Sequence, residues 1–243
     1  MLPQILTEGI VLKALDDTLH GAAGQGRGGK GYHVSKPPTR RKVLAGTTAV
    51  VSTCLPRWAL AAPVIGAPAP GFSLPDQDGA MRGLAEQRGR LVVLEWTNHE
   101  CPYVRKHYGS GNMQALQREA TQQGVVWFSV ASSPEGEQGH VTGRQAKILT
   151  VNRDAAPTAV LLDHRSQVAR AYGATTTPQM FLIGADGVLL YMGGIDSIRS
   201  TRQEDIGRAQ PFFRDALRAV LAGRPVERAS TPPYGCAVKY API

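Results

Sequence analysis

The chain has 243 residues, enough for one large domain or two small ones, and its hydrophobic content of 42% is ordinary for a protein with a packed core. The formal net charge of +8 is uneven, because residues 1–61 hold eight basic and three acidic side chains while residues 62–243 hold nineteen and sixteen. Basic residues in the second part alternate with acidic ones and form no run interleaved with aromatics. The composition therefore argues against a nucleic-acid-binding surface.

The N-terminal part of the chain has the pattern of a secretory leader. Arg40 and Arg41 stand before a short apolar stretch, Val43 to Leu55, which is followed by Ala59-Leu60-Ala61-Ala62. The stretch is too short to span a bilayer comfortably. The paired arginines resemble a twin-arginine leader, with cleavage expected after about Ala61.

This interpretation divides the chain into a leader region, residues 1–61, and one folded domain, residues 62–243. Residues 1–36 form a glycine-containing extension to which we assign no structure. We expect a periplasmic or otherwise exported protein that uses the twin-arginine machinery and keeps no stable membrane anchor after cleavage. A membrane anchor, an unrelated basic turn, and a lipoprotein acylated at Cys54 are the alternatives.

The remaining elements are predicted from hydrophobic patterning. Residues 62–90 carry four prolines and the turn signal Asp78-Gly79, so they are predicted to be irregular. In chain order we then expect a strand at 91–96, a helix at 102–123 that breaks near 109–111, a strand at 125–130, a helix at 141–149, a strand at 158–163, a helix at 167–172, a strand at 179–183, a turn at 185–187, a strand at 188–192 and a helix at 209–222. Parallel βαβ units followed by a hairpin and a closing helix indicate an α/β domain.

Cys101 is the candidate reactive group of this domain. The chain has three cysteines and no CxxC pair or zinc-type spacing, and Cys54 would leave with the leader. Cys101 stands between a predicted strand and a helix that begins at Pro102, where the helix dipole favours the reactive thiolate. Arg105, one helical turn on, would add positive charge, whereas Glu100 would oppose the thiolate. The alternative is a buried inert cysteine.

Several segments together resemble thioredoxin-like proteins of the peroxiredoxin-related redoxin (alkyl hydroperoxide reductase) family. They are Trp96 to Lys106 around Cys101, Thr177-Pro178 before a strand, Asp186-Gly187 at a hairpin, and Tyr234-Gly235-Cys236 near the end of the chain. The resemblance covers about residues 64–240. It implies a thioredoxin fold, in which a central mixed β-sheet is flanked by helices, with Thr177 and a cis Pro178 shaping a substrate groove that faces Cys101.

The sequence also departs from this family. Asn98 occupies the place of the peroxiredoxin Thr or Ser three residues before the cysteine, and also that of the first thioredoxin cysteine, while Thr97 lies one step earlier. Thr97 or Asn98 would bind an oxyanion or peroxide, or serve only in a turn. His99 and His107 are proton carriers or solvent-exposed residues. Cys236 is a resolving thiol, half of a static disulfide, or a spare.

The resemblance implies an exported thiol oxidoreductase that reduces peroxides through Cys101, with resolution by Cys236 and an external thiol reductant. No nucleotide-binding glycine pattern is present, so we expect no metal, flavin or nucleotide cofactor. The alternatives are a thiol–disulfide oxidoreductase of exported proteins, a copper-binding module with Thr97 as a poor first ligand, and a non-catalytic redoxin-fold binding protein.

Overall fold

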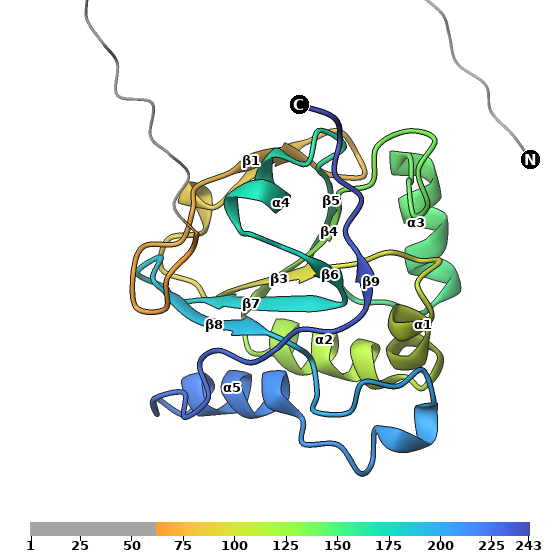
Figure 1. Ribbon diagram of the computed structural model, residues 1–243. Helices are drawn as coiled ribbons and strands as arrows, with labels where there is room; N and C mark the ends of the chain where they lie inside the picture. The colour runs from red at the N-terminus through yellow and green to blue at the C-terminus, as the bar shows by residue number, and fades with distance from the viewer. Residues whose placement is uncertain (1–61) are drawn as a thin grey trace, which may run out of the picture. The chain divides into compact units, whose positions relative to one another are not determined.

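A mixed five-stranded sheet forms the centre of the computed structural model, which describes residues 62–243 (Figure 1). The strand order is β5-β4-β3-β7-β8. The strands are β3 (Val92–Trp96), β4 (Val126–Ala131), β5 (Ala159–Leu162), β7 (Gln179–Ile183) and β8 (Leu189–Gly193). Strands β3, β4 and β5 run parallel, whereas β7 is antiparallel to both β3 and β8. The predicted leader, with Cys54, lies outside the described residues.

The middle of the sheet is built from the apolar runs of the sequence. Every residue of β3 and β4 is buried, as expected for strands covered on both faces. Leu94 and Trp96 pack into the core on one face, and Val93 packs into the core on the other. The predicted strands and the α/β class are therefore confirmed.

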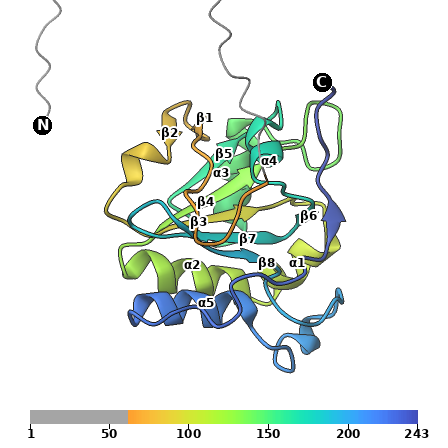
Figure 2. The same cartoon turned by 60° about the vertical axis from the view of Figure 1, so that its left-hand side comes forward.

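Two layers cover the sheet, as Figure 2 shows from a second side. On one face lie α1 (Pro102–Gly109), α2 (Asn112–Gln122) and α5 (Phe212–Leu221). On the other lie α4 (Gln167–Ala171) and a small hairpin. The remaining helices are α3 (Gly143–Asn152) and the short 3-10 helices η1 (Ala85–Gln87) and η2 (Gln203–Asp205). Gly111, with φ +75°, separates α1 from α2 at the predicted break.

Two regions are more ordered than the sequence predicts. Residues 62–90 are not wholly irregular, because β1 (Ser73–Pro75) and β2 (Met81–Gly83) form a hairpin around the predicted turn. The C-terminal tail contributes β9 (Cys236–Ala237), which pairs antiparallel with β6 (Thr176–Thr177). Strands this short leave no periodic pattern in a sequence.

The third helix begins later than predicted because Thr142 caps it. The Thr142 hydroxyl accepts a hydrogen bond from the backbone N–H of Gln145, and the Gln145 side chain accepts one from the backbone N–H of Thr142. This reciprocal capping box satisfies two N–H groups that the helix itself leaves unpaired. The helix therefore starts at Gly143 and continues to Asn152.

Replacing Thr142 by alanine is expected to lower the free energy of unfolding by about 1 kcal/mol, because the cap is lost while an exposed side chain leaves no cavity. Urea unfolding of the two proteins measures the difference. Thr142→Ser, which keeps the hydroxyl, is the control and should stay close to the parent. Equal losses in both variants would contradict the capping role.

Candidate functional site

Cys101 lies at the junction of β3 and α1. It is the residue before the first turn of α1, with φ −69° and ψ 123°, and Pro102 occupies the first helical position. Its side chain is fully buried. As a thiol, it donates a hydrogen bond to the carbonyl oxygen of Thr177, with 3.1 Å between the sulfur and the oxygen. The predicted groove residues and the predicted reactive thiol are thus brought together.

Cys236 reaches the same place from the other end of the chain. In the β6–β9 pair, Cys236 is the register partner of Thr177, which precedes a cis peptide bond to Pro178. Gly235 before it has φ +146°, and a Cβ there would lie 1.9 Å from the Thr177 carbonyl oxygen. Only glycine therefore lets the tail approach this closely. Both cysteines of residues 62–243 are free thiols.

The two thiols differ in acidity. Burial raises the pKa of Cys101, but the neighbouring Cys236 thiol, the Thr177 side chain and the backbone N–H groups of Val104 and Cys236 outweigh it, so the pKa lies below its usual value. Burial, the hydrogen bond to Cys101 and repulsion from the Cys101 thiolate raise the pKa of Cys236 to about 12. Of the two thiols, Cys101 is therefore the one that ionises more readily, and Cys236 stays protonated beside it.

A buried ion pair ties α1 to the C-terminal tail. The Lys106 Nζ atom lies 3.1 Å from Asp196 Oδ2 and 3.2 Å from the Tyr234 hydroxyl, and it also donates to the carbonyl oxygen of Ile198. The Tyr234 hydroxyl donates to the other Asp196 oxygen. Since Cys101 immediately precedes α1 and Tyr234 stands two residues before Cys236, this cluster fixes the segments that carry both thiols.

His107 lies against the same cluster. It is buried, so the expectation that it is solvent-exposed is wrong. Its Nε2 atom is 3.4 Å from the Tyr234 hydroxyl and 3.7 Å from Asp196 Oδ2, and its Nδ1 atom is 2.9 Å from the Asn112 amide. The pKa of His107 is lowered to about 4, mainly by burial; the Asp196 charge opposes this shift and the Lys106 charge adds to it. The imidazole is therefore neutral at pH 7.

This burial predicts a loss of stability in mild acid. The unfolded chain binds a proton at His107 near pH 6.5 and the folded chain only near pH 4, so the contribution is complete above pH 6.5 and is lost as the pH falls toward 4. The loss at pH 4 relative to pH 7 is about 3 kcal/mol. Urea unfolding across this range measures it.

The matched variant is His107→Gln, which lacks the titration. The buried acids Glu95 and Asp163, whose pKa values burial raises, titrate in both proteins and cancel in the comparison. The wild type should lose more stability than the variant between pH 6.5 and 4. Parallel losses in the two proteins would show that His107 does not titrate as described.

The side-chain polar atoms of two predicted site residues, Asn98 and Arg105, bind partners other than Cys101. The Asn98 side chain accepts a hydrogen bond from the backbone N–H of Glu100 at 2.9 Å and donates to the carbonyl oxygen of Gln138 at 3.3 Å, which is a turn role. The guanidinium of exposed Arg105 donates to the carbonyl oxygen of His99. Arg105 is not among the groups that set the pKa of Cys101, so the structure gives no support to the expected charge assistance.

Thr97 lines two pockets, a small one that it shares with Thr177 and a second one that it shares with Arg153, a residue that no sequence motif singled out. Glu95 was not predicted either. It is a fully buried carboxyl that accepts hydrogen bonds from Tyr108, Gln117, Trp127 and Ser129. An acidic residue within an apolar strand was the available signal for it. No comparable signal pairs Lys106 with Asp196, because the two residues are far apart in the chain.

Residues 62–243 contain no group of three or more His, Cys, Asp and Glu side chains placed to hold a metal ion. Nor does any helix in this range have the length and apolar character needed to cross a bilayer.

Known proteins place the chain by sequence and by fold. The model of the AhpC/TSA family matches residues 65–192, just over half of the chain. An uncharacterized conserved protein from Geobacillus kaustophilus is 26% identical, with 74% of this chain and 94% of that one covered and a TM-score of 0.62. A hypothetical protein from Sinorhizobium meliloti 1021 is 24% identical, with coverages of 74% and 97% and a TM-score of 0.62. No protein of curated function matches the chain.

Proposed function

The chain belongs to the AhpC/TSA family and is a thiol oxidoreductase of the redoxin kind, and from this premise we propose that it reduces peroxides at Cys101 with Cys236 as the resolving thiol. One observation carries the proposal. The carbonyl oxygen of Thr177 accepts a hydrogen bond from the Cys101 thiol, and Thr177 is the register partner of Cys236 in the β6–β9 pair. One residue therefore contacts both segments that carry the thiols.

The reaction follows from the acidity of the two groups. The Cys101 thiolate attacks one peroxide oxygen, the O–O bond breaks, and the leaving oxygen takes a proton to become water or an alcohol. Cys101 becomes a sulfenic acid. The Cys236 sulfur then attacks the sulfenic sulfur, an S–S bond forms, and water leaves. An external dithiol supplies two electrons and two protons that restore both thiols.

The effect of Cys101 on the pKa of Cys236 favours attack by Cys101 first and resolution by Cys236 second. Two of the three causes that raise the pKa of Cys236 are its hydrogen bond to Cys101 and repulsion from the Cys101 thiolate. Conversion of Cys101 to a neutral sulfenic acid removes that repulsion. Cys236 thus becomes easier to ionise only after Cys101 has been oxidised, which limits wasteful reactions of the reduced enzyme.

The alternative function, exchange with protein disulfides, is less favoured by access. Cys101 is fully buried and the tail segment with Tyr234 and Cys236 lies against it, so a protein disulfide must displace β9 before it reaches the sulfur. A peroxide is far smaller and requires a smaller opening. Access therefore supports a peroxide over a protein disulfide as the oxidant.

Export is part of the proposal and rests on the sequence of residues 39–62. The twin-arginine pattern and the Ala-Leu-Ala-Ala site would deliver residues 62–243 to an oxidising compartment. Expression of the full chain in a bacterial host with and without Arg40→Lys and Arg41→Lys tests this. We expect the parent chain to accumulate in the periplasm as a form that begins near Ala62. The variant with both arginines replaced should not accumulate there.

The reaction itself is tested by turnover of the full chain, in a Cys54→Ala background that leaves only the two thiols discussed. Hydrogen peroxide and cumene hydroperoxide are compared with insulin disulfides, with dithiothreitol as reductant. We expect catalysed consumption of peroxide and no acceleration of insulin reduction over dithiothreitol alone. The reverse outcome would establish the disulfide-exchange function instead.

A further inference from the structure

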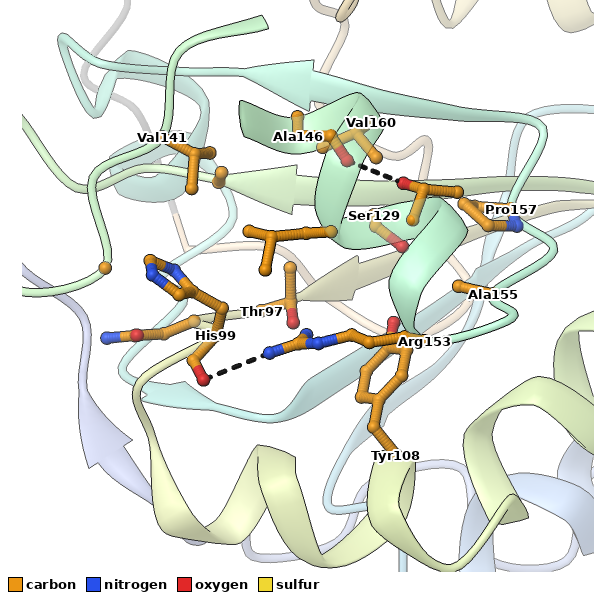
Figure 3. Close-up of a pocket in the computed structure, with 15 residues that line it drawn as sticks. Thr97, His99, Tyr108, Ser129, Val141, Ala146, Arg153, Ala155, Pro157 and Val160 are labelled. Carbon is orange, nitrogen blue, oxygen red and sulfur yellow. Dashed lines mark hydrogen bonds between the residues drawn. The ribbon is translucent and has the colours of Figure 1, made fainter. Parts of the chain in front are cut away.

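A pocket lined by the Thr97–His99 segment and by Arg153 has features of a ligand-binding site (Figure 3). Its cavity volume is about 50 Å³. Neither Cys101 nor Cys236 lines it, so it is separate from the thiol pair. Its walls come from the ends of β3 and β4, from α3 and from the residues that follow α3.

The pocket has one polar side. The hydroxyl of Thr97 and the Nδ1 atom of His99 are buried and have no hydrogen-bond partner among residues 62–243. Buried polar atoms without partners are rare in folded proteins, because each costs about 1–3 kcal/mol. Both residues line the pocket, and in Figure 3 they lie on the same side of it as Arg153. A ligand with hydrogen-bonding atoms would satisfy them.

The same side carries the positive charge of Arg153, with which no carboxylate of residues 62–243 forms a direct ion pair. The Arg153 guanidinium donates one hydrogen bond, from Nη2 to the carbonyl oxygen of His99 at 3.0 Å, and stacks 4.8 Å from the Tyr108 ring centroid. Within residues 62–243 it forms no ion pair and no other hydrogen bond. Its remaining N–H groups are therefore free to bind a planar anion, for which a guanidinium is well suited.

The opposite wall is apolar. Val141, Ala146 and Val160 lie across from Thr97 and Arg153 in Figure 3, and Leu149 completes this wall. These side chains form part of a small hydrophobic cluster between α3 and the sheet. A ligand that is anionic at one end and hydrocarbon at the other would match both sides of the pocket.

We propose that this pocket binds a short-chain monocarboxylate, with the carboxylate on Arg153 and Thr97 and the alkyl chain against α3. A carboxylate forms the bidentate pair that a guanidinium prefers, and one of its oxygens can accept a further hydrogen bond from the Thr97 hydroxyl. Neutral His99, whose pKa burial lowers, can donate from Nδ1. This binding site goes beyond the proposed peroxide reduction and does not depend on it.

Isothermal titration calorimetry of the full, reduced chain with sodium hexanoate tests the site. We expect saturable binding of one hexanoate with a dissociation constant of about 1 mM, ordinary for a ligand of this size. Hexan-1-ol should bind at least about tenfold more weakly, because it lacks the charge. Absence of saturable binding up to about 10 mM hexanoate would overturn the proposal.

Variants assign the binding to the pocket. Arg153→Met should weaken hexanoate binding at least about tenfold and Thr97→Val several-fold, since each removes a polar partner. Arg144→Met is the matched control, because Arg144 is exposed on α3 and does not line the pocket. If Arg153→Met does not fold, Arg153→Lys and Thr97→Val decide. The assignment would be refuted if the Arg153 variant and Thr97→Val both bound hexanoate with the affinity of the parent. It would also be refuted if Arg144→Met lost as much affinity as they do.

Discussion

Replacing Cys101 by serine is expected to abolish peroxide reduction, with a loss on the order of a thousandfold or more. Serine keeps the size of the side chain but not the thiolate, which alone attacks the peroxide oxygen. The variant should fold like the parent, because the fully buried position is filled by a similar group. Steady-state peroxide consumption with dithiothreitol measures the loss.

Cys236→Ser is the control that separates attack from resolution. Its first turnover should proceed, because Cys101 still attacks, and Cys101 should then accumulate as sulfenic acid and be oxidised further. Mass spectrometry after one equivalent of peroxide distinguishes the two variants. Retained peroxide consumption in Cys101→Ser, or an unreactive Cys101 in Cys236→Ser, would contradict the assigned roles.

Breaking the buried ion pair between Lys106 and Asp196 is expected to destabilise the fold by about 3–5 kcal/mol. In Lys106→Met, the Asp196 carboxylate remains buried and loses its cationic partner at 3.1 Å. The Tyr234 hydroxyl loses one of its anchors as well, so closure of the disulfide with Cys236 should slow in addition. Chemical unfolding and rapid-quench thiol trapping measure the two effects.

Two comparisons sharpen this prediction. Arg218→Gln removes an exposed ion pair to Glu119 and should change stability by about 1 kcal/mol or less. The double variant Lys106→Met with Asp196→Asn should recover part of the loss, because no unpaired charge remains buried. A loss in Lys106→Met no larger than that in Arg218→Gln would mean that the cluster does not hold the tail.

The sequence predicts the sheet well because its strands are continuous apolar runs, such as Val125 to Val130, that can only be buried. It also predicts Cys101 at the start of a helix, because Pro102 marks the first turn. It fails where the local signal is short. The hairpin formed by β1 and β2 and the tail strand β9 owe their structure to partners elsewhere in the chain, which no local pattern contains.

The candidate site shows the same division. The meeting of Cys101, Thr177 and Cys236 was expected only through family resemblance, and the β6–β9 pairing supplies its physical basis. The direction of a side chain was harder to predict: Arg105 is one turn from Cys101, yet its guanidinium binds the carbonyl oxygen of His99. Helical spacing determines the position of the Arg105 backbone, whereas the available hydrogen-bond acceptors determine the direction in which its guanidinium points.

The most direct test of the redox pair is disulfide mapping of the full chain in the Cys54→Ala background. The reduced protein is treated with one equivalent of hydrogen peroxide, alkylated, digested without reductant and analysed by mass spectrometry. The expected product is a peptide pair joined by a Cys101–Cys236 disulfide, which dithiothreitol reverses. Oxidised Cys101 beside a Cys236 that remains fully alkylated would contradict it.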